Sequence, residues 1–281
     1  MLRIAVPNKG SLAEPSAEML REAGYATRRD ARQLTLTDDE NDVEFFYLRP
    51  RDIAVYVGSG TLDVGITGRD LLLDSGAPAR EVLELGYAPS TFRYASRPGV
   101  VGGLAEIDGR RVATSYPGLV SAHLRDAGVT AEVVRLDGAV ETAVQLGVAD
   151  VIADVVETGS TLRAAGLEVF GDPILQSQAV LVCRAAVEPP AGTDVLVRRL
   201  QGVLVARQYV MVDYDVPVEL VERACEITPG LESPTVSSLQ NKEWAAVRSM
   251  VPRSRTNQVM DELYALGARA ILVTTIHACR I

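Results

Sequence analysis

The sequence predicts a mixed α/β protein that ends in a smaller βαββαβ module of the ferredoxin-like kind. Two observations support this prediction. Short apolar runs alternate with helical patterns over about the first 180 residues, which is typical of α/β domains with a parallel or mixed sheet. After Tyr209 the order of elements becomes β-α-β-β-α-β. The length of 281 residues allows two or three domains of roughly 100–200 residues each.

Each predicted strand is a short apolar run, and helices are placed by their apolar spacing and by prolines and glycines at their ends. The predicted strands of the first part are 2–6, 42–48, 62–67, 111–114, 131–136, 150–154 and 179–183. The predicted helices there are 11–24 and 70–74, with a helical or extended piece at 53–57. A helix over 195–208 leads to the final module, predicted from strands 209–213, 235–239, 244–251 and 270–276 and helices 217–226 and 256–266.

Composition narrows the function classes. The chain is 47% hydrophobic and 23% charged, as globular proteins are, and its net charge of −9 argues against a nucleic-acid partner. The three cysteines are far apart in the sequence, so we expect no CxxC redox pair and no zinc site built on cysteines. Because there are only two histidines, we expect no histidine-rich metal centre. The sequence begins directly with a strand pattern and contains no apolar run of about 18 residues, so we expect no signal peptide, no membrane contact and a cytoplasmic location.

The most informative segment is a strand that ends at Asp154 and leads into a turn rich in glycine and hydroxyl groups. The backbone amides and hydroxyls of Thr158, Ser160 and Thr161 can face an anion at the start of a helix. Gly159 lets a ligand approach the backbone closely. Asp154 can accept hydrogen bonds from ribose hydroxyls or help to hold Mg²⁺. This pattern suits a 5-phosphoribosyl group, although an ordinary capped helix start fits the turn alone equally well.

Basic residues follow the first strands. Lys9 and Gly10 lie in the loop after the first strand, where Lys9 can neutralise a phosphate or simply be solvated. Arg49 and Arg51 flank a proline after the next strand. They can contact a polyphosphate, or they can form ordinary ion pairs at the surface.

Acidic and aromatic residues mark the same edge of the predicted sheets. Asp70 can cap a helix or contact a nucleoside, and Tyr116 can border a cleft or serve in packing. Glu141 and Asp154 together suit Mg²⁺, which takes its other ligands from water and substrate. For Glu141, simple complementation of a helix dipole is the alternative.

A longer pattern spans residues 141–162 as E-x5-G-x-A-x2-I-x-D-V-x2-T-G-x-T-L. This pattern resembles the signature of the ATP phosphoribosyltransferase family, and every defined position is filled. Other segments agree with the resemblance, namely residues 3–10, 48–53, 65–70 and 228–235. The resemblance covers essentially the whole chain and includes the C-terminal module, as in the long, self-regulated form of the family.

The resemblance implies a two-lobed catalytic part of the type II periplasmic-binding-protein kind. We expect lobe I at 1–90 plus 184–208, lobe II with the phosphoribosyl-binding loop at 91–183, and a regulatory domain at 209–281. The implied enzyme is a glycosyltransferase that moves the phosphoribosyl group of phosphoribosyl pyrophosphate (PRPP) to N1 of ATP, releasing pyrophosphate with Mg²⁺ as cofactor. This reaction opens histidine biosynthesis.

The implied residue roles fall into four groups. Lys9 and Asp154 are the implied catalytic residues, and Glu141 and Asp154 the implied metal ligands. The implied PRPP contacts are Asp154, Glu157, Thr158, Gly159, Ser160 and Thr161. The implied ATP contacts are Lys9, Gly10, Leu12, Arg49, Asp70 and Tyr116. The implied contacts of histidine as an allosteric inhibitor are Asp215, Leu231, Ser233, Thr235 and Ala270.

The resemblance also implies a homo-oligomer (dimer or hexamer) and competition by AMP for the active cleft. Two alternatives stay open at this point. One is a non-catalytic solute-binding protein on the same two-lobed fold. The other is a phosphoribosyltransferase that acts on a different base.

Overall fold

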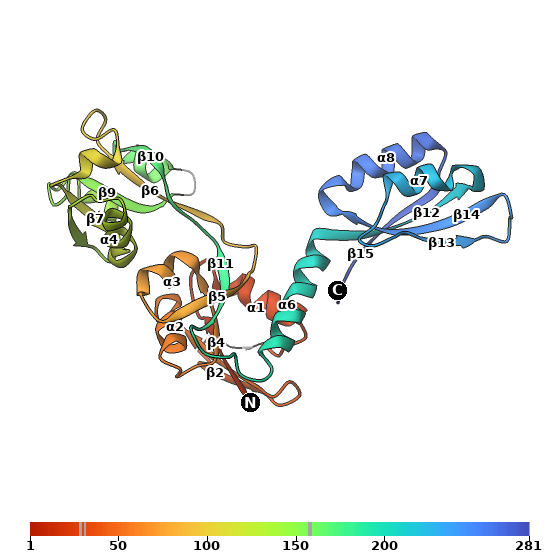
Figure 1. The fold of residues 1–281 in the computed structure, drawn as a ribbon, viewed down its shortest axis with the longest axis horizontal. Helices are drawn as coiled ribbons and strands as arrows, with labels where there is room; N and C mark the ends of the chain where they lie inside the picture. Colours follow the sequence, from red (N-terminus) through yellow and green to blue (C-terminus); the bar gives the residue numbers. More distant parts are fainter. Residues whose placement is uncertain (28–29, 31, 157–158, 281) are drawn as a thin grey trace. The chain divides into compact units, whose positions relative to one another are not determined.

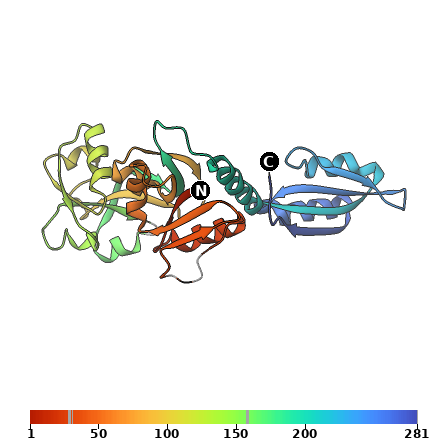
Figure 2. The ribbon, with the colours of Figure 1, turned by 90° about the horizontal axis from the view of Figure 1, so that it is seen from below.

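The chain is described here from a computed structural model that covers residues 1–27, 30, 32–156 and 159–280 (Figure 1). Contacts divide it into two units, Met1–Arg21 with Tyr25–Asp194, and Glu22–Gly24 with Val195–Ile281. The sequence placed residues 184–208 in lobe I, whereas the contacts place 195–208 in the second unit. The reason is local, because helix α6 (Thr193–Gln208) continues without a loop into strand β12 (Tyr209–Pro217) of that unit (Figure 2).

The first unit has two lobes, each with its own mixed sheet. In lobe I the strands lie in the order β2 (Thr35–Asp38), β3 (Val43–Leu48), β1 (Leu2–Pro7), β4 (Val64–Gly68), β11 (Ala179–Arg184) and β5 (Ala79–Glu84). The helices of this lobe are α1 (Ala13–Glu22), α2 (Pro50–Gly58) and α3 (Arg69–Ser75). Strands β1, β3 and β4 run parallel, so the loops that follow them meet at one edge of the sheet.

Strand β11 corrects the expected lobe boundary at 183. It returns from lobe II and pairs antiparallel with both β4 and β5, so residues 179–183 belong to lobe I. Its five residues from Ala179 to Cys183 are buried, which is why the run reads as a core strand. A strand returning from the second lobe into the first sheet gives the two-lobed type II architecture that the resemblance implied.

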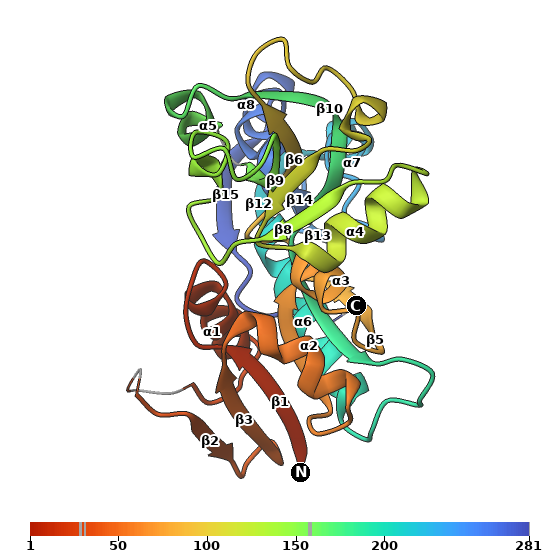
Figure 3. The ribbon, with the colours of Figure 1, turned by 90° about the vertical axis from the view of Figure 1, so that its left-hand side faces the viewer.

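In lobe II the strands lie in the order β10 (Glu168–Ser177), β6 (Ser90–Ser96), β9 (Val151–Val156), β7 (Arg111–Thr114) and β8 (Glu132–Arg135). Helices α4 (Pro117–Asp126) and α5 (Ser160–Ala164) lie on opposite sides of this sheet (Figure 3). Short 3-10 turns occupy Leu104–Ile107 and Val140–Thr142. Four strands escaped the sequence prediction, β2, β5, β6 and β10, because exposed or mixed-polarity strands leave no continuous apolar run.

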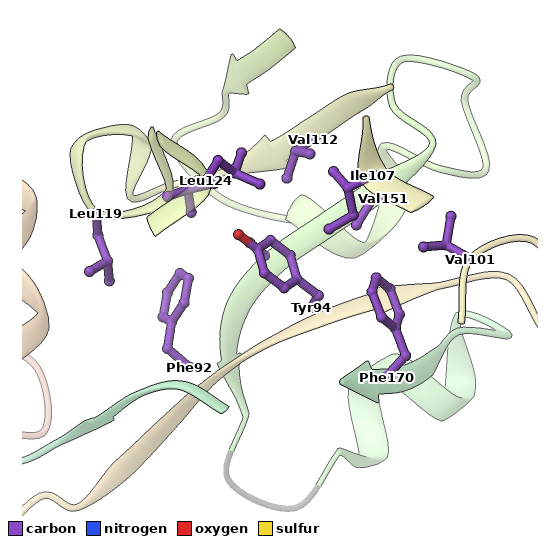
Figure 4. Close-up of a cluster of buried hydrophobic side chains, with 11 residues drawn as sticks. Phe92, Tyr94, Val101, Ile107, Val112, Leu119, Leu124, Val151 and Phe170 are labelled. Carbon is purple, nitrogen blue, oxygen red and sulfur yellow. The ribbon is translucent and has the colours of Figure 1, made fainter. Parts of the chain in front are cut away.

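The core of lobe II fixes β9, the strand that leads to the phosphoribosyl-type turn. Val151 and Ala153 pack with α4, whereas Ile152 packs with Leu162 of α5 on the other face. Figure 4 shows the α4 side, where Phe92 and other apolar residues fill the space over the sheet. Full burial of a valine, isoleucine or phenylalanine side chain contributes about 1.5–3 kcal/mol to folding. This burial anchors the first half of β9, residues 151–153, whereas residues 154–156 at its end are half-buried.

The second unit is the ferredoxin-like module that the sequence predicted. Its strands lie in the order β13 (Thr235–Ser238), β14 (Trp244–Pro252), β12 and β15 (Arg269–Thr275), and every pair is antiparallel. Helices α7 (Val221–Ile227) and α8 (Thr256–Leu266) cover one face of the sheet (Figure 1). Short 3-10 turns precede them at Val218–Leu220 and Arg253–Arg255. No helix in the described residues is long and apolar enough to cross a membrane.

Candidate functional site

The first cavity lies where β9 ends and α5 begins, and it has a volume of about 370 Å³. Its lining consists of Glu141, Asp154, Val155, Val156, Gly159, Ser160, Thr161 and Leu162. The predicted glycine is required by geometry, because Gly159 has a φ of +67°, which residues with a side chain rarely adopt. Glu157 and Thr158, which the sequence assigned to the same turn, lie outside the described residues.

Helix α5 has only five residues, so its dipole is weaker than the sequence suggested. Local amides and hydroxyls must therefore supply most of the attraction for an anion. Sequence reasoning also missed Arg163, whose guanidinium lies beside this turn: a Cβ placed on Gly159 would be 3.3 Å from Arg163 Nη1. The signal was present in the sequence, since residues four apart on a helix share a face.

Asp154 and Glu141 give the first cavity its negative charge. Burial, reinforced by the charge of Glu141, raises the pKa of Asp154, while Arg51 opposes that shift. The Val155 amide donates a hydrogen bond to Asp154 Oδ1 over 2.8 Å. No cluster of three or more metal-ligating side chains occurs in the described residues. Mg²⁺ is usually bound through one or two carboxylates, with water and substrate phosphates completing its shell. The donor set therefore fits Mg²⁺.

The second cavity adjoins the first and shares Val155 with it. It has a volume of about 240 Å³. Its lining includes five predicted residues, Lys9, Gly10, Leu12, Asp70 and Tyr116, together with Ser11, Pro50, Gly68, Leu71, Ala88, Ser90, Val155, Ser177 and Gln178. Residues of both lobes contribute, so this cavity depends on how the lobes meet.

The predicted Arg49 is not among the described residues that line either cavity. Its backbone forms the N-cap of α2, and its side chain is exposed. The neighbouring Arg51 does not line either cavity, but its guanidinium lies 4.4 Å from the centre of the ring of Tyr116, which lines the second cavity. Arg49 has extended backbone before the helix (φ −65°, ψ 135°), whereas Arg51 lies within its first turn, and the sequence spacing alone did not decide where the helix begins.

Asp70 is buried in the first turn of α3, but it does not cap that helix, whose N-cap is Gly68. Ser177 Oγ donates to Asp70 Oδ1 over 2.8 Å and accepts from the Asp70 amide over 3.0 Å. The Tyr116 hydroxyl also hydrogen-bonds Asp70, and burial together with this carboxylate raises the pKa of Tyr116. Asp70 thus connects α3 to Ser177 and Tyr116 of lobe II, and Ser177 was not singled out by the sequence.

A third cavity of about 380 Å³ lies in the second unit, across all four strands of its sheet. Three predicted effector residues line it, Asp215, Thr235 and Ala270, while Leu231 and Ser233 are not among its described lining. Those two residues precede β13 in the chain and belong to none of the four strands.

Asp213 and Arg248 also line the third cavity and pair over 2.6 Å. They stand opposite each other on β12 and β14, next to Asp215, which lies on the same face of β12. Alternation along β12 could have suggested Asp213, because residues two apart in a strand share a face. Arg248 could be placed only once the strand register was known.

The fold and the adjoining cavities define a two-lobed α/β protein with a turn rich in glycine and hydroxyl groups beside a second cavity. Comparison with known proteins gives the particular family. A family model described as ATP phosphoribosyltransferase matches residues 49–202, and one described as HisG, C-terminal domain, matches residues 206–278. The chain therefore belongs to the ATP phosphoribosyltransferase family, glycosyltransferases that act at the first step of histidine biosynthesis.

Individual relatives agree with this assignment. A protein of Paenarthrobacter aurescens (strain TC1) named ATP phosphoribosyltransferase is 65% identical over 286 residues, and one of Salinispora tropica is 63% identical over 281 residues; in both cases 100% of each chain is covered. A solved ATP phosphoribosyl transferase (HisG:HisZ) complex from Thermotoga maritima matches with a TM-score of 0.62 and 26% identity, covering 73% of this chain and 98% of that chain. These matches favour the enzyme over the non-catalytic solute-binding alternative.

Proposed function

We propose that the first cavity binds PRPP and the second binds ATP, so that the phosphoribosyl group passes between them to N1 of adenine. The observation that carries this proposal is the junction of the two cavities at Val155. A reacting carbon held in the first cavity and a purine held in the second can meet there. Such positioning replaces a bimolecular encounter with an effectively unimolecular step.

The turn from Gly159 to Thr161 holds the 5′-phosphate through its amides and hydroxyls, with Arg163 beside it. Asp154 accepts from the ribose hydroxyls and, with Glu141, would hold Mg²⁺. When bound, Mg²⁺ neutralises charge on the departing pyrophosphate. Lys9 lines the second cavity and adds a positive charge where phosphates of the two substrates come together.

Adenine N1 is a neutral nucleophile, so attack on the anomeric carbon requires no covalent enzyme intermediate. As the new C–N bond forms, the bond from C1 to the pyrophosphate oxygen breaks and pyrophosphate leaves. Tyr116 and Leu12 line the purine side of the site. AMP carries the same base and competes with ATP in this cavity.

The test is formation of phosphoribosyl-ATP, followed by ultraviolet absorbance with PRPP, ATP and Mg²⁺. Product requires all three components, and EDTA in excess abolishes it until Mg²⁺ is restored. Substitution of GTP or inosine triphosphate for ATP tests the base. Equal turnover with those nucleotides would favour a phosphoribosyltransferase of different base specificity.

We also propose that the third cavity binds histidine and that this binding inhibits the enzyme. An amino acid needs an anion for its ammonium and a cation for its carboxylate. Asp215 has no ion-pair partner among the described residues, and Arg248 supplies the cation. Thr235 and Ser237 add hydroxyls. Histidine titrated into the same assay tests this assignment, and turnover unaffected at any concentration would remove it.

The remaining expectations concern the protein in the cell. We propose that it works in the cytoplasm as a homo-oligomer, a dimer or a hexamer, as the family resemblance implies. Sedimentation of the purified protein with and without histidine measures the assembly directly.

A further inference from the structure

The N-terminus of helix α4 is capped by a residue of the other lobe. The first helical residue is Pro117, and the N-cap residue, Tyr116, makes no side-chain cap hydrogen bond. The amides that follow still need acceptors, because the first turn of a helix leaves them unpaired. Asp74, at the end of α3 in lobe I, supplies them: its Oδ1 accepts from Gly118 N over 2.9 Å and from Leu119 N over 3.2 Å.

The second oxygen of Asp74 reaches back into its own lobe. Arg51 Nη1 lies 3.2 Å from Asp74 Oδ2, and the Asp74 side chain is only 12% exposed. The same arginine stacks on the Tyr116 ring. The Asp74 carboxylate therefore binds both the first amides of α4 and the guanidinium of Arg51, which packs on Tyr116 just before that helix.

Gly118 shows how closely the lobes meet here. A Cβ at this position would overlap the carbonyl oxygen of Asp74. Because α4 would otherwise favour a better helix former than glycine, the absence of a side chain marks the contact rather than a need of the helix.

From this geometry we infer that Asp74 is a positioning residue for ATP. By capping α4 across the lobes, it fixes Tyr116 against Arg51 and Asp70 at the wall of the second cavity. This inference rests on the proposed assignment of that cavity to ATP. The first cavity depends on it much less, since all its described lining residues belong to lobe II.

The test compares KM for ATP with KM for PRPP in three variants. Asp74→Ala should raise KM for ATP by about tenfold, which corresponds to the loss of one good N-cap, and leave KM for PRPP unchanged. Asp74→Asn should restore most of the ATP affinity, because asparagine caps a helix nearly as well as aspartate. Gly118→Ala, which pushes the lobes apart from the other side, should raise KM for ATP in the same direction.

Asp126→Ala serves as the matched control, because Asp126 ends the same helix and forms its ion pair with exposed Arg125. It should leave both KM values unchanged. Two results for Asp74→Ala and Gly118→Ala would overturn the inference. One is an equal rise of KM for ATP and KM for PRPP, and the other is no rise in either.

A further variant separates this inference from the cavity assignment. Ser90→Trp places a large side chain in the second cavity, whose described lining does not include Asp74 or Gly118. If it raises KM for ATP while the Asp74 variants do not, the positioning role fails and the assignment stands. If it leaves KM for ATP unchanged, the assignment itself fails, and the positioning role with it.

Discussion

Asp154 is a carboxylate whose surroundings disfavour its charge. Its pKa is raised by burial and then by Glu141, so the folded state takes up a proton more readily than the unfolded chain. The charged Asp154 carboxylate therefore lowers the free energy of unfolding. This destabilisation is complete at a pH above the pKa of Asp154 in the folded protein, and it disappears as the pH falls below its pKa in the unfolded chain. A buried carboxylate whose pKa is raised in this way is typical of a functional site.

Asp154→Asn should therefore lower kcat on the order of 100-fold, the scale seen when one preorganised polar group is lost from an active site. The same variant should unfold at a higher temperature than the wild type at pH 7.5, and this gain should shrink at acidic pH. Asp150→Asn is the control, since Asp150 directly precedes the same strand and pairs with the partly exposed Arg111. Turnover equal to that of the control would contradict the role of Asp154.

Gly159 supports a second prediction at the residue scale. Gly159→Ala places a side chain at a φ of +67°, which costs about 1–2 kcal/mol, and it crowds Arg163. If the binding free energy of PRPP is weakened by that amount, KM for PRPP should rise roughly tenfold. Gly166→Ala, at a φ of +70° with open space around it, should lose similar stability and keep its KM. Identical KM values in the two variants would refute the phosphate-binding turn.

At the scale of elements, the irregular edge strand β15 shapes the third cavity. Its pairing with β12 shifts register between Asp213 and Asp215, and Ala270 adopts a φ of +49°. A bulge of this kind bends an edge strand and redirects its side chains. We therefore expect the shape of the third cavity to depend on the backbone conformation at Ala270 more than on its methyl group.

Ala270→Gly should retain inhibition by histidine and raise stability by about 1 kcal/mol, because glycine adopts this backbone without strain. Ala270→Val should weaken inhibition, since a β-branched residue resists a positive φ. Inhibition constants measured by the transfer assay report both effects. Thr275→Val, at the far end of β15, is the control. A valine variant as sensitive to histidine as the wild type would exclude the bulge from the effector site.

At the scale of the whole molecule, an effector that binds the native state must also stabilise it. Histidine at 100 times its dissociation constant should add about 2.7 kcal/mol to the free energy of unfolding. Thermal unfolding of the full chain should show this shift, and Asp215→Ala should abolish it while leaving transfer activity intact. Asp261→Ala, on the exposed side of α8, should behave as the wild type. A shift preserved in Asp215→Ala would place the effector elsewhere.

Most of the secondary structure and much of the candidate site were determined by the sequence alone. Strand β7 and helix α8 begin and end where predicted, because periodicity and turn residues act within a few residues. The turn around Gly159 was identified for the same local reason, and the long motif gave the family. Exposed strands such as β5 were missed, since they bury too little to show a pattern.

The tertiary structure decided what depends on residues far apart in the chain. It inserted β11 into the first sheet, paired Ser177 with Asp70 over 107 residues and joined Asp74 to Gly118 over 44. It also placed the Arg51 guanidinium against the Tyr116 ring and brought Asp213 and Arg248 together in the lining of the third cavity. Local propensity cannot fix such contacts, because they follow from strand order, register and the path of the chain between lobes.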